Sequence, residues 1–333
     1  VVGSVDEDQM VSIQLDITDV DAADVLTTHS VTGLDNGTIE IKSVESLLEL
    51  GGVMLWLDAT NIDDANNSTL SDGAKIEIWQ DLSGNDHHAS QTDINKRPVY
   101  NSENKEVVFP RVNREYFDFN NNPAEGVTAG ELYIIIKSDG TGVDESAFHN
   151  WGANNGPMYD KNGKIWETFG RHNRKSFDID ADMNLYNLYN VSSHSDGNWY
   201  ARFNGQQKAH YSGTTVNFGN SWNANKLKLG GDGDNSDGIN GASYDEFKGR
   251  IQEVIFFDHV LSESDRKRLN YYLAKKWNLT DIVDSDGDTF LDKDDDTPIG
   301  DEEIELGVVT GLIVNYTPTA NYHGTEVFEY TVN

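Results

Sequence analysis

Apolar and polar residues alternate along short runs in most of the chain, with the two-residue period of strands that bury one face. Between residues 53 and 257 these runs are rich in aromatic and β-branched residues and are separated by Gly, Asn and Asp, which is typical of a β-sandwich. The runs cover 11–17, 53–59, 76–79, 107–109, 116–119, 132–136, 199–203, 226–229, 250–257 and 328–332. The pattern predicts a mostly β chain.

One helix is predicted after the last central strand. Ser262 and Asp265 have the spacing of a capping box, which satisfies free backbone N–H groups at a helix start. Leu269, Leu273 and Trp277 follow at intervals of four residues. They form an apolar stripe, so we expect this helix to pack on the sandwich.

The two ends of the chain are predicted to form one split β-domain. Neither end is expected to bury a core alone, because very short chains rarely fold without staples. The Asn36-Gly37 pair is a hairpin signal. We expect a split domain at 1–48 plus 300–333, a central domain at 49–281 and a connecting loop at 282–299.

Motifs in both ends share the order and spacing of one known repeat. They are Glu-Asp at 7–8, Asp-x-Asp at 19–21, Asn-Gly-Thr at 36–38, Tyr-Thr-Pro at 316–318, Asn-Tyr-x-Gly at 321–324 and Phe-x-Tyr-Thr-Val at 328–332. This resembles the cadherin-like extender repeats of large bacterial adhesins of the repeats-in-toxin type. The resemblance implies a secreted, cell-surface protein whose extender repeats contact one another and hold out a ligand-binding module.

The central segment resembles a second family. Residues 55–59, 79–85, 97–98, 249–255 and 261–277 are similar to the concanavalin A-like, laminin-G-type lectin domains. The predicted fold is therefore all-β: a concanavalin A-like jelly-roll sandwich with one C-terminal helix, inserted into a split Ig/cadherin-like β-sandwich.

Composition narrows the possible partners. The chain begins at Val1 without a signal peptide, so we expect it to be a piece of a longer protein, and no apolar run approaches the ~20 residues of a membrane span. It has no cysteine and a net charge of −32. Nucleic-acid binding is excluded on that charge. Solubility is an alternative reason for the acidity.

The acidic residues are grouped. Segments 1–50 and 281–333 hold 25 of the 57 acidic residues and two of the 25 basic ones. The most distinct group has the spacing of a twelve-residue calcium-binding loop, in which alternate residues direct oxygen atoms at one cation. Its predicted ligands are Asp284, Asp286, Asp288, the carbonyl of Phe290, Asp292 and Asp295.

This loop resembles the calcium loops of thrombospondin type-3 repeats and dockerins. Thr289 replaces the usual Gly at the sixth position, and Asp295 replaces Glu at the twelfth. We expect a calcium-stiffened hinge, with a solvated acidic linker as the alternative. Several Ca²⁺ ions are expected in all, because further candidate ligands stand at Glu7, Asp8, Asp19, Asp21, Asp232, Asp234 and Asp237. For the last three, the alternative is a metal-free polar turn.

No catalytic constellation is found in the central segment. Retaining glucanases of this fold place Glu and Asp on alternate strand positions to flank one sugar bond. No such run occurs, nor does a Gly-x-Ser-x-Gly or a His-Glu-x-x-His motif. The sequence therefore predicts a protein that is not an enzyme.

Two loop groups suggest ligand binding. Trp151 offers an aromatic face, and Asn150, Asn154 and Asn155 offer amides, which suits sugar stacking and hydroxyl binding. Asn235 is a further candidate ligand residue, in the loop of Asp232, Asp234 and Asp237. Arg171, His172 and Asn173 begin a basic island that suits an anionic ligand. The alternatives are a core Trp151 and a solvated basic turn.

Together these features predict a monomeric, calcium-dependent adhesin module. Its expected ligands are glycans on cells or surfaces, in adhesion and biofilm formation. A peptide-binding or protein-binding module of the same fold is the first alternative. A structural spacer and a glycosidase are the others.

Overall fold

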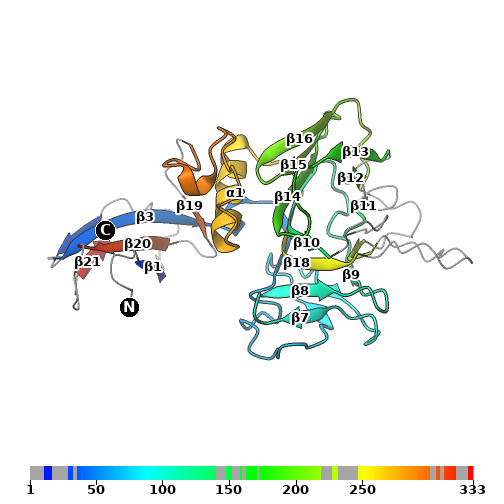
Figure 1. Cartoon of the computed structure of the whole chain (residues 1–333), viewed down its shortest axis with the longest axis horizontal. Helices are drawn as coiled ribbons and strands as arrows, with labels where there is room; N and C mark the ends of the chain where they lie inside the picture. Colours follow the sequence, from blue (N-terminus) through cyan, green and yellow to red (C-terminus); the bar gives the residue numbers. More distant parts are fainter. Residues whose placement is uncertain are drawn as a thin grey trace, which may run out of the picture. The chain divides into compact units, whose positions relative to one another are not determined.

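The chain forms two compact units, which are described separately (Figure 1). In this computed structural model, unit 1 comprises Val1–Leu50 with Gly300–Asn333, and unit 2 comprises Gly51–Ile299. The structure describes residues 11–16, 29–32, 36–119, 121–139, 148–151, 158–159, 163–170, 173–218, 227–231, 247–300, 305–307, 311–319 and 329–332.

Unit 1 joins strands from both ends of the chain. One sheet has the order β1 (Val11–Asp16), β20 (Gly311–Pro318), β3 (Gly37–Ser46) and β19 (Glu305–Gly307); β2 (His29–Thr32) pairs with β21 (Glu329–Val332). Strands β3 and β20 are antiparallel, with Gly37 opposite Pro318 and Val44 opposite Gly311. A short 3-10 helix, η1 (Leu47–Leu50), ends this part of the chain. The segments before and after unit 2 therefore share one hydrogen-bonded ladder.

The Asn36-Gly37 pair does not close the expected hairpin. The strands on its two sides, β2 and β3, pair with β21 and β20 instead of with each other. Gly37 is required for another reason, since a Cβ there would lie 2.3 Å from the ring of Tyr316. The Tyr316 hydroxyl donates to the Asn36 carbonyl at 2.9 Å, which closes this contact.

Unit 2 is built on one large antiparallel sheet. Its order is β16 (Gln206–Tyr211), β15 (Trp199–Phe203), β14 (Asn187–Ser193), β10 (Gly130–Ser138), β18 (Gly249–Phe257), β8 (Glu106–Phe109) and β7 (Val99–Asn101), and β4 (Val53–Asp58) also pairs with β18. Leu132, Ile134 and Ile136 of β10 belong to the core cluster, so every second side chain faces the core. The residues between them are buried as well, on the other face of the sheet.

Two smaller sheets cover that face. One consists of β11 (Met158–Tyr159), β12 (Lys164–Glu167) and β13 (Lys175–Asp178); the other of β17 (Lys228–Leu229), β9 (Phe117–Phe119), β6 (Ala89–Ser90) and β5 (Ile78–Trp79). Phe177 meets Trp199 with ring centres 6.2 Å apart, and Phe117 meets Phe109 at 6.0 Å. The predicted all-β sandwich is confirmed.

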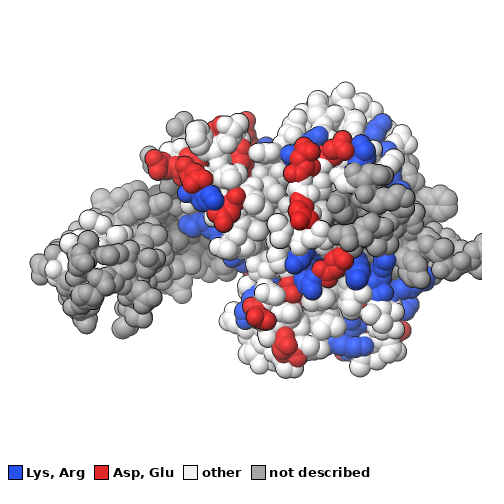
Figure 2. Space-filling view, viewed as in Figure 1, with Lys and Arg blue, Asp and Glu red and all other residues white. Residues whose placement is uncertain are grey.

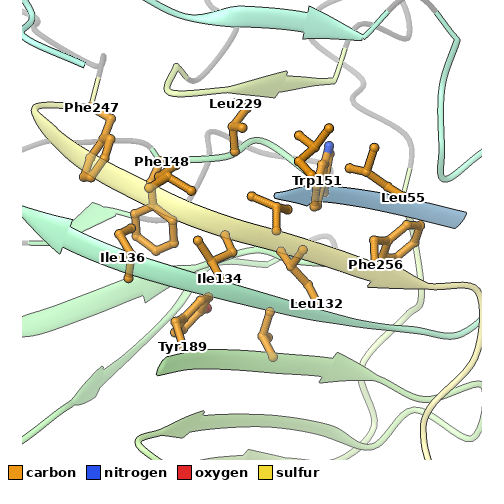
Figure 3. Packing of buried hydrophobic residues seen from close by; sticks show 14 of the residues in the cluster. Leu55, Leu132, Ile134, Ile136, Phe148, Trp151, Tyr189, Leu229, Phe247 and Phe256 are labelled. Atoms are coloured by element: carbon orange, nitrogen blue, oxygen red, sulfur yellow. The ribbon is translucent and has the colours of Figure 1, made fainter. Parts of the chain in front are cut away.

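The core between these layers is rich in aromatic side chains (Figure 3). Phe148, Trp151 and Phe256 lie beside Leu132 and Ile134, and all five are almost fully buried. On the face drawn in Figure 2, acidic and basic side chains are interspersed over the surface of unit 2.

A single α-helix occurs among the described residues, where it is predicted. The helix α1 (Glu263–Lys276) begins at Ser262, whose hydroxyl accepts from the Asp265 N–H at 3.1 Å. Leu269 and Leu273 are buried. Lys276 fixes the far end of the helix, because its ammonium lies 2.6 Å from Asp58. Within the described part of the chain, no helix is long and apolar enough to cross a membrane.

Candidate functional site

Three aspartates of the predicted calcium loop converge. Asp284, Asp286 and Asp288 each offer a carboxylate oxygen, and these oxygens lie within 4.8 Å of one another. Asp284 is 2% exposed. Clustered carboxylates repel one another strongly unless a cation lies between them. This group is therefore able to hold a metal ion.

The loop is shaped by its own carboxylates. Asp284 accepts the N–H groups of Gly287 at 2.8 Å and Thr289 at 3.1 Å, and Asp288 accepts that of Phe290 at 2.8 Å. Gly287 and Thr289 have φ angles of 82° and 87°. A positive φ is unusual for a β-branched residue. The loop thus holds Thr289 in a strained conformation at the position where the calcium-loop pattern prefers Gly.

The other predicted ligands lie differently. Asp292 is buried and turned to Ser285, whose N–H and hydroxyl both donate to it at 2.8 Å. Burial, with repulsion from Asp284 and Asp295, raises the pKa of Asp292 to about 6. The Phe290 side chain is largely exposed. The structure therefore brings three of the five predicted carboxylates into one group, whereas Asp292 stabilises the loop through its hydrogen bonds with Ser285.

This loop, with the short helix η2 (Asp292–Asp294), is attached to the body of unit 2. The Asp284 N–H donates to the Asn204 carbonyl at 3.2 Å, and the Asn270 amide donates to the Ser285 carbonyl at 3.3 Å. Asn204 lies in the β15–β16 turn, and Asn270 lies on α1. The loop is thus held between a turn of the large sheet and the helix.

A second group of polar residues is buried inside the sandwich. His149, Glu167 and Tyr189 are fully buried. The Tyr189 hydroxyl donates to the Glu167 carboxylate, His149 Nε2 lies 3.4 Å from it, and the N–H groups of Thr168 and Phe169 donate to it at 2.7 Å. Burial opposes the charge, but His149 and these donors hold the pKa of Glu167 below its usual range. The group connects the segments 148–151 and 163–170, which directly precede two of the predicted ligand loops in the sequence.

Asn150 and Trp151 belong to this core, which corrects the prediction that they face a sugar. Asn150 is fully buried, and its side-chain oxygen accepts the Lys228 N–H at 2.5 Å. Trp151 is 1% exposed and packs against Phe119 and Phe256 with ring centres 5.6 Å apart (Figure 3). Asn150 thus positions the backbone at Lys228, and Trp151 is a core residue, which was the alternative interpretation.

The flanks of the predicted ligand loops are joined by backbone hydrogen bonds. Gly170 donates to the Trp151 carbonyl at 2.7 Å, Gly230 to the Phe148 carbonyl at 2.9 Å, and Phe247 to the Gly230 carbonyl at 3.1 Å. These residues border the segments 152–157, 171–172 and 232–246. Those segments lie outside the described residues and contain Asn154, Asn155, Arg171, His172, Asp232, Asp234, Asn235 and Asp237. Glu7, Asp8, Asp19 and Asp21 also lie outside them.

Among the predicted ligand residues that the structure describes, Asn173 lines a hollow. The hollow has a volume of about 150 Å³ and lies between the start of β13 and the end of β16; it is lined by Asn173, Lys175, Tyr211, Ser212, Gly213, Thr214 and Thr215. Sequence reasoning missed residues 211–215. Their signal was a run of hydroxyl residues around a Gly directly after a strand, which is the composition of a turn and of many sugar sites alike.

The comparisons with known proteins found matches among solved structures only. No family model matches the sequence, and no curated protein matches it. A Trypanosoma rangeli sialidase in complex with 2,3-difluorosialic acid is similar with 14% sequence identity and a TM-score of 0.44; the match covers 64% of this chain and 32% of the sialidase. The same sialidase in complex with sialic acid is similar at 16% identity, 68% of this chain, 33% of that chain and a TM-score of 0.43.

A carbohydrate-binding structure is also similar. It is the CBM40 of a Ruminococcus gnavus IT-sialidase bound to α2,3-sialyllactose, with 12% sequence identity and a TM-score of 0.34; the match covers 63% of this chain and 95% of that structure. Sialidases and a CBM40 are thus among the structures similar to this chain.

These matches contradict the prediction that the protein is not an enzyme, because sialidases are enzymes. That prediction rested on the lack of a known motif, and such a lack excludes only the chemistries with that motif. The chain spans about a third of the length of the sialidases it matches. The matches assign no activity and no substrate to this chain.

Proposed function

We propose that unit 2 is a glycan-binding module. The observation that carries the proposal is the polar hollow between β13 and β16, which combines an amide, an ammonium, hydroxyls and an aromatic wall. Sugars are recognised by such groups, through hydrogen bonds to their hydroxyls and contact with an aromatic face. The hollow is joined to the loop flanks, because the Asn217 N–H donates to the Gly170 carbonyl at 3.0 Å.

Calcium is the metal that best suits the aspartate loop. A hard cation with oxygen ligands matches Asp284, Asp286 and Asp288, which offer no nitrogen or sulfur. The ion would offset the mutual repulsion of these side chains and stabilise the loop between the β15–β16 turn and α1. The remaining predicted calcium ligands stay part of this proposal.

Adhesion is the proposed role of the whole chain. The motifs of residues 1–48 and 300–333 support an extender domain that contacts neighbouring repeats and presents a monomeric module at the bacterial surface, in adhesion and biofilm formation. The peptide-binding alternative rests on the same hollow, since an ammonium and an amide also suit a peptide carboxylate.

A paired screen tests this function. Glycan and peptide arrays are probed with the whole chain in calcium and in excess chelator. We expect signal on glycans, with a loss in chelator. Signal on peptides alone would favour the alternative, and silence on both arrays in calcium would contradict the binding role.

Calcium dependence is tested on stability. We expect chelator to lower the melting temperature, because the three carboxylates then repel one another. Asp286→Ala with Asp288→Ala should remove the response to chelator. The control is Asp86→Ala with Glu263→Ala, which removes two charges from side chains that are 85% and 82% exposed. An unchanged melting temperature in excess chelator would refute the calcium proposal.

A further inference from the structure

We propose that the hollow between β13 and β16 binds a sugar that carries a carboxylate, with Lys175 as the partner of that charge. This inference rests on the proposed glycan binding and names the class of glycan. It is carried by the local charge, by the placement of Lys175 and by the rigidity of the walls.

The charge of the hollow is opposite to that of the chain. The chain has 57 acidic and 25 basic residues. None of the seven residues that line the hollow is acidic, and one of them, Lys175, is cationic. A cation without a carboxylate in the same lining gives the hollow a local positive charge, which favours an anion.

Lys175 is held at the rim of the core. It lies on the same face of β13 as the buried Phe177, because the two residues are two positions apart in a strand. Its ammonium lies 5.3 Å from the centre of the Tyr211 ring, within the range of a cation–π contact. The side chain is therefore placed over the wall of the hollow.

The acidic residues closest to Lys175 in the sheet have other partners. Glu167 is opposite Lys175 in the ladder, and it already accepts from Tyr189 and from the backbone of Thr168 and Phe169. Asp178, on the same strand, pairs with Lys164 at 3.2 Å. The Lys175 ammonium thus remains able to meet a carboxylate from outside.

The walls are fixed before any ligand arrives. The Tyr211 hydroxyl donates to the Ser176 carbonyl at 3.1 Å, and its ring packs on Trp199 at 5.8 Å. The Thr214 N–H and hydroxyl both donate to the Gly197 carbonyl at 2.9 Å. A site that is ordered in advance loses less conformational entropy on binding.

The remaining polar groups suit ring hydroxyls. Asn173, Ser212 and Thr215 are exposed and line the hollow. An amide and hydroxyl groups both donate and accept, as sugar hydroxyls do.

The test compares ligands that differ in a single charge. Methyl glucuronide is compared with methyl glucoside, and sialyllactose with its neutral carboxyl methyl ester, by calorimetry on the whole chain. The variants are Lys175→Gln, Lys175→Arg and, as a control on the next strand, Lys164→Gln. We expect the acidic sugars to bind more tightly than their neutral partners, and more weakly as salt is added.

Lys175→Gln should lower the affinity for the acidic sugars about ten- to a hundredfold, since a hydrogen bond to a charged group is stronger than one between neutral groups. The affinity for the neutral sugars should stay unchanged in this variant. Lys175→Arg should retain most of the affinity, and Lys164→Gln all of it. Unchanged melting temperatures will show that the variants are folded.

The outcomes separate this inference from the proposed function. Glycan binding that is equal for acidic and neutral sugars, or unaffected by Lys175→Gln, overturns the inference and leaves the glycan-binding function standing. Loss of both sugar classes in Lys175→Gln also overturns it. If no glycan on the arrays binds, both the inference and the proposed glycan-binding function are refuted.

Discussion

At the scale of single residues, Glu131 shows how a buried charge joins two elements. Its carboxylate accepts from Arg266 at 3.0 Å, Asn190 at 2.9 Å, Tyr133 at 2.9 Å and the Leu261 N–H at 2.9 Å. Burial opposes the charge, but the arginines Arg266 and Arg202 with these donors hold the pKa of Glu131 below its usual value of 4.5. One carboxylate thereby ties β10 to the start of α1.

This pairing predicts an acid-sensitive contribution to stability. Because the folded-state pKa is depressed, the stabilisation is complete above about pH 4.5 and is lost as the pH falls through the folded pKa. Glu131→Gln should lower the free energy of unfolding at pH 7 by about 3 kcal/mol, since it leaves a buried arginine without its partner.

Urea unfolding from pH 7 to about pH 3 measures this effect. The gap between wild type and Glu131→Gln should narrow as the pH falls. Glu263→Gln, in an exposed pair with Lys267 at 4.0 Å, is the control and should cost less than about 1 kcal/mol at any pH. A constant gap for Glu131→Gln would show that its charge contributes nothing.

Residues with a local pattern were predictable, and residues with distant partners were not. The Ser262 cap and the convergence of Asp284, Asp286 and Asp288 follow from spacing within a few positions. Glu131 meets Arg266 across 135 positions, so no local motif announces it. Trp151 lies beside amides in the sequence, and only its burial reveals a core residue.

At the scale of elements, the aspartate loop depends on the turn it rests against. Gly205, in the β15–β16 turn, has a φ of 81°, and a Cβ there would lie 1.8 Å from the Asp284 carbonyl oxygen. The close approach leaves no room for a side chain. The turn and the loop must therefore fold against each other.

Gly205→Ala is expected to destabilise unit 2 and to disturb the loop. Gly84→Ala is the matched control, because Gly84 has a φ of 85° with nothing within 4 Å of an added Cβ. Both changes strain the backbone by about 1–2 kcal/mol. Gly205→Ala adds about 1–3 kcal/mol from the clash.

Thermal melts of the two variants in calcium and in chelator separate the contributions. A larger loss for Gly205→Ala, together with a smaller response to chelator, would confirm the contact. Equal losses in the two variants would show that the turn yields without affecting the loop.

At the scale of the whole molecule, the hydrophobic cluster formed by the described residues lies within unit 2. Every residue of that buried cluster falls between Leu55 and Phe256. We therefore expect residues 51–299, produced alone, to fold with the melting temperature of unit 2 in the whole chain and to keep its ligand binding. A molten fragment by near-ultraviolet circular dichroism would refute this independence.

The strand content of unit 2 was predictable from alternation, whereas the order of its strands was not. Alternation shows that a strand has a buried face and carries no information on its neighbour. The pairing of β18 with β10, β8 and β4 therefore required the structure. The hollow escaped prediction for the same reason, because β13 and β16 come together only through the stacking of two sheets.

The ladder between β3 and β20 has a mechanical consequence. Its eight registered pairs, from Gly37 with Pro318 to Val44 with Gly311, join the chain on both sides of unit 2. A pull on the chain from either side would enter unit 1 through β1 and β21, which pair with β20 and β2, and would be carried by the ladders of unit 1. Unit 2 would then hang as an unstretched side branch, and a ligand could remain bound in it while the backbone outside is under tension.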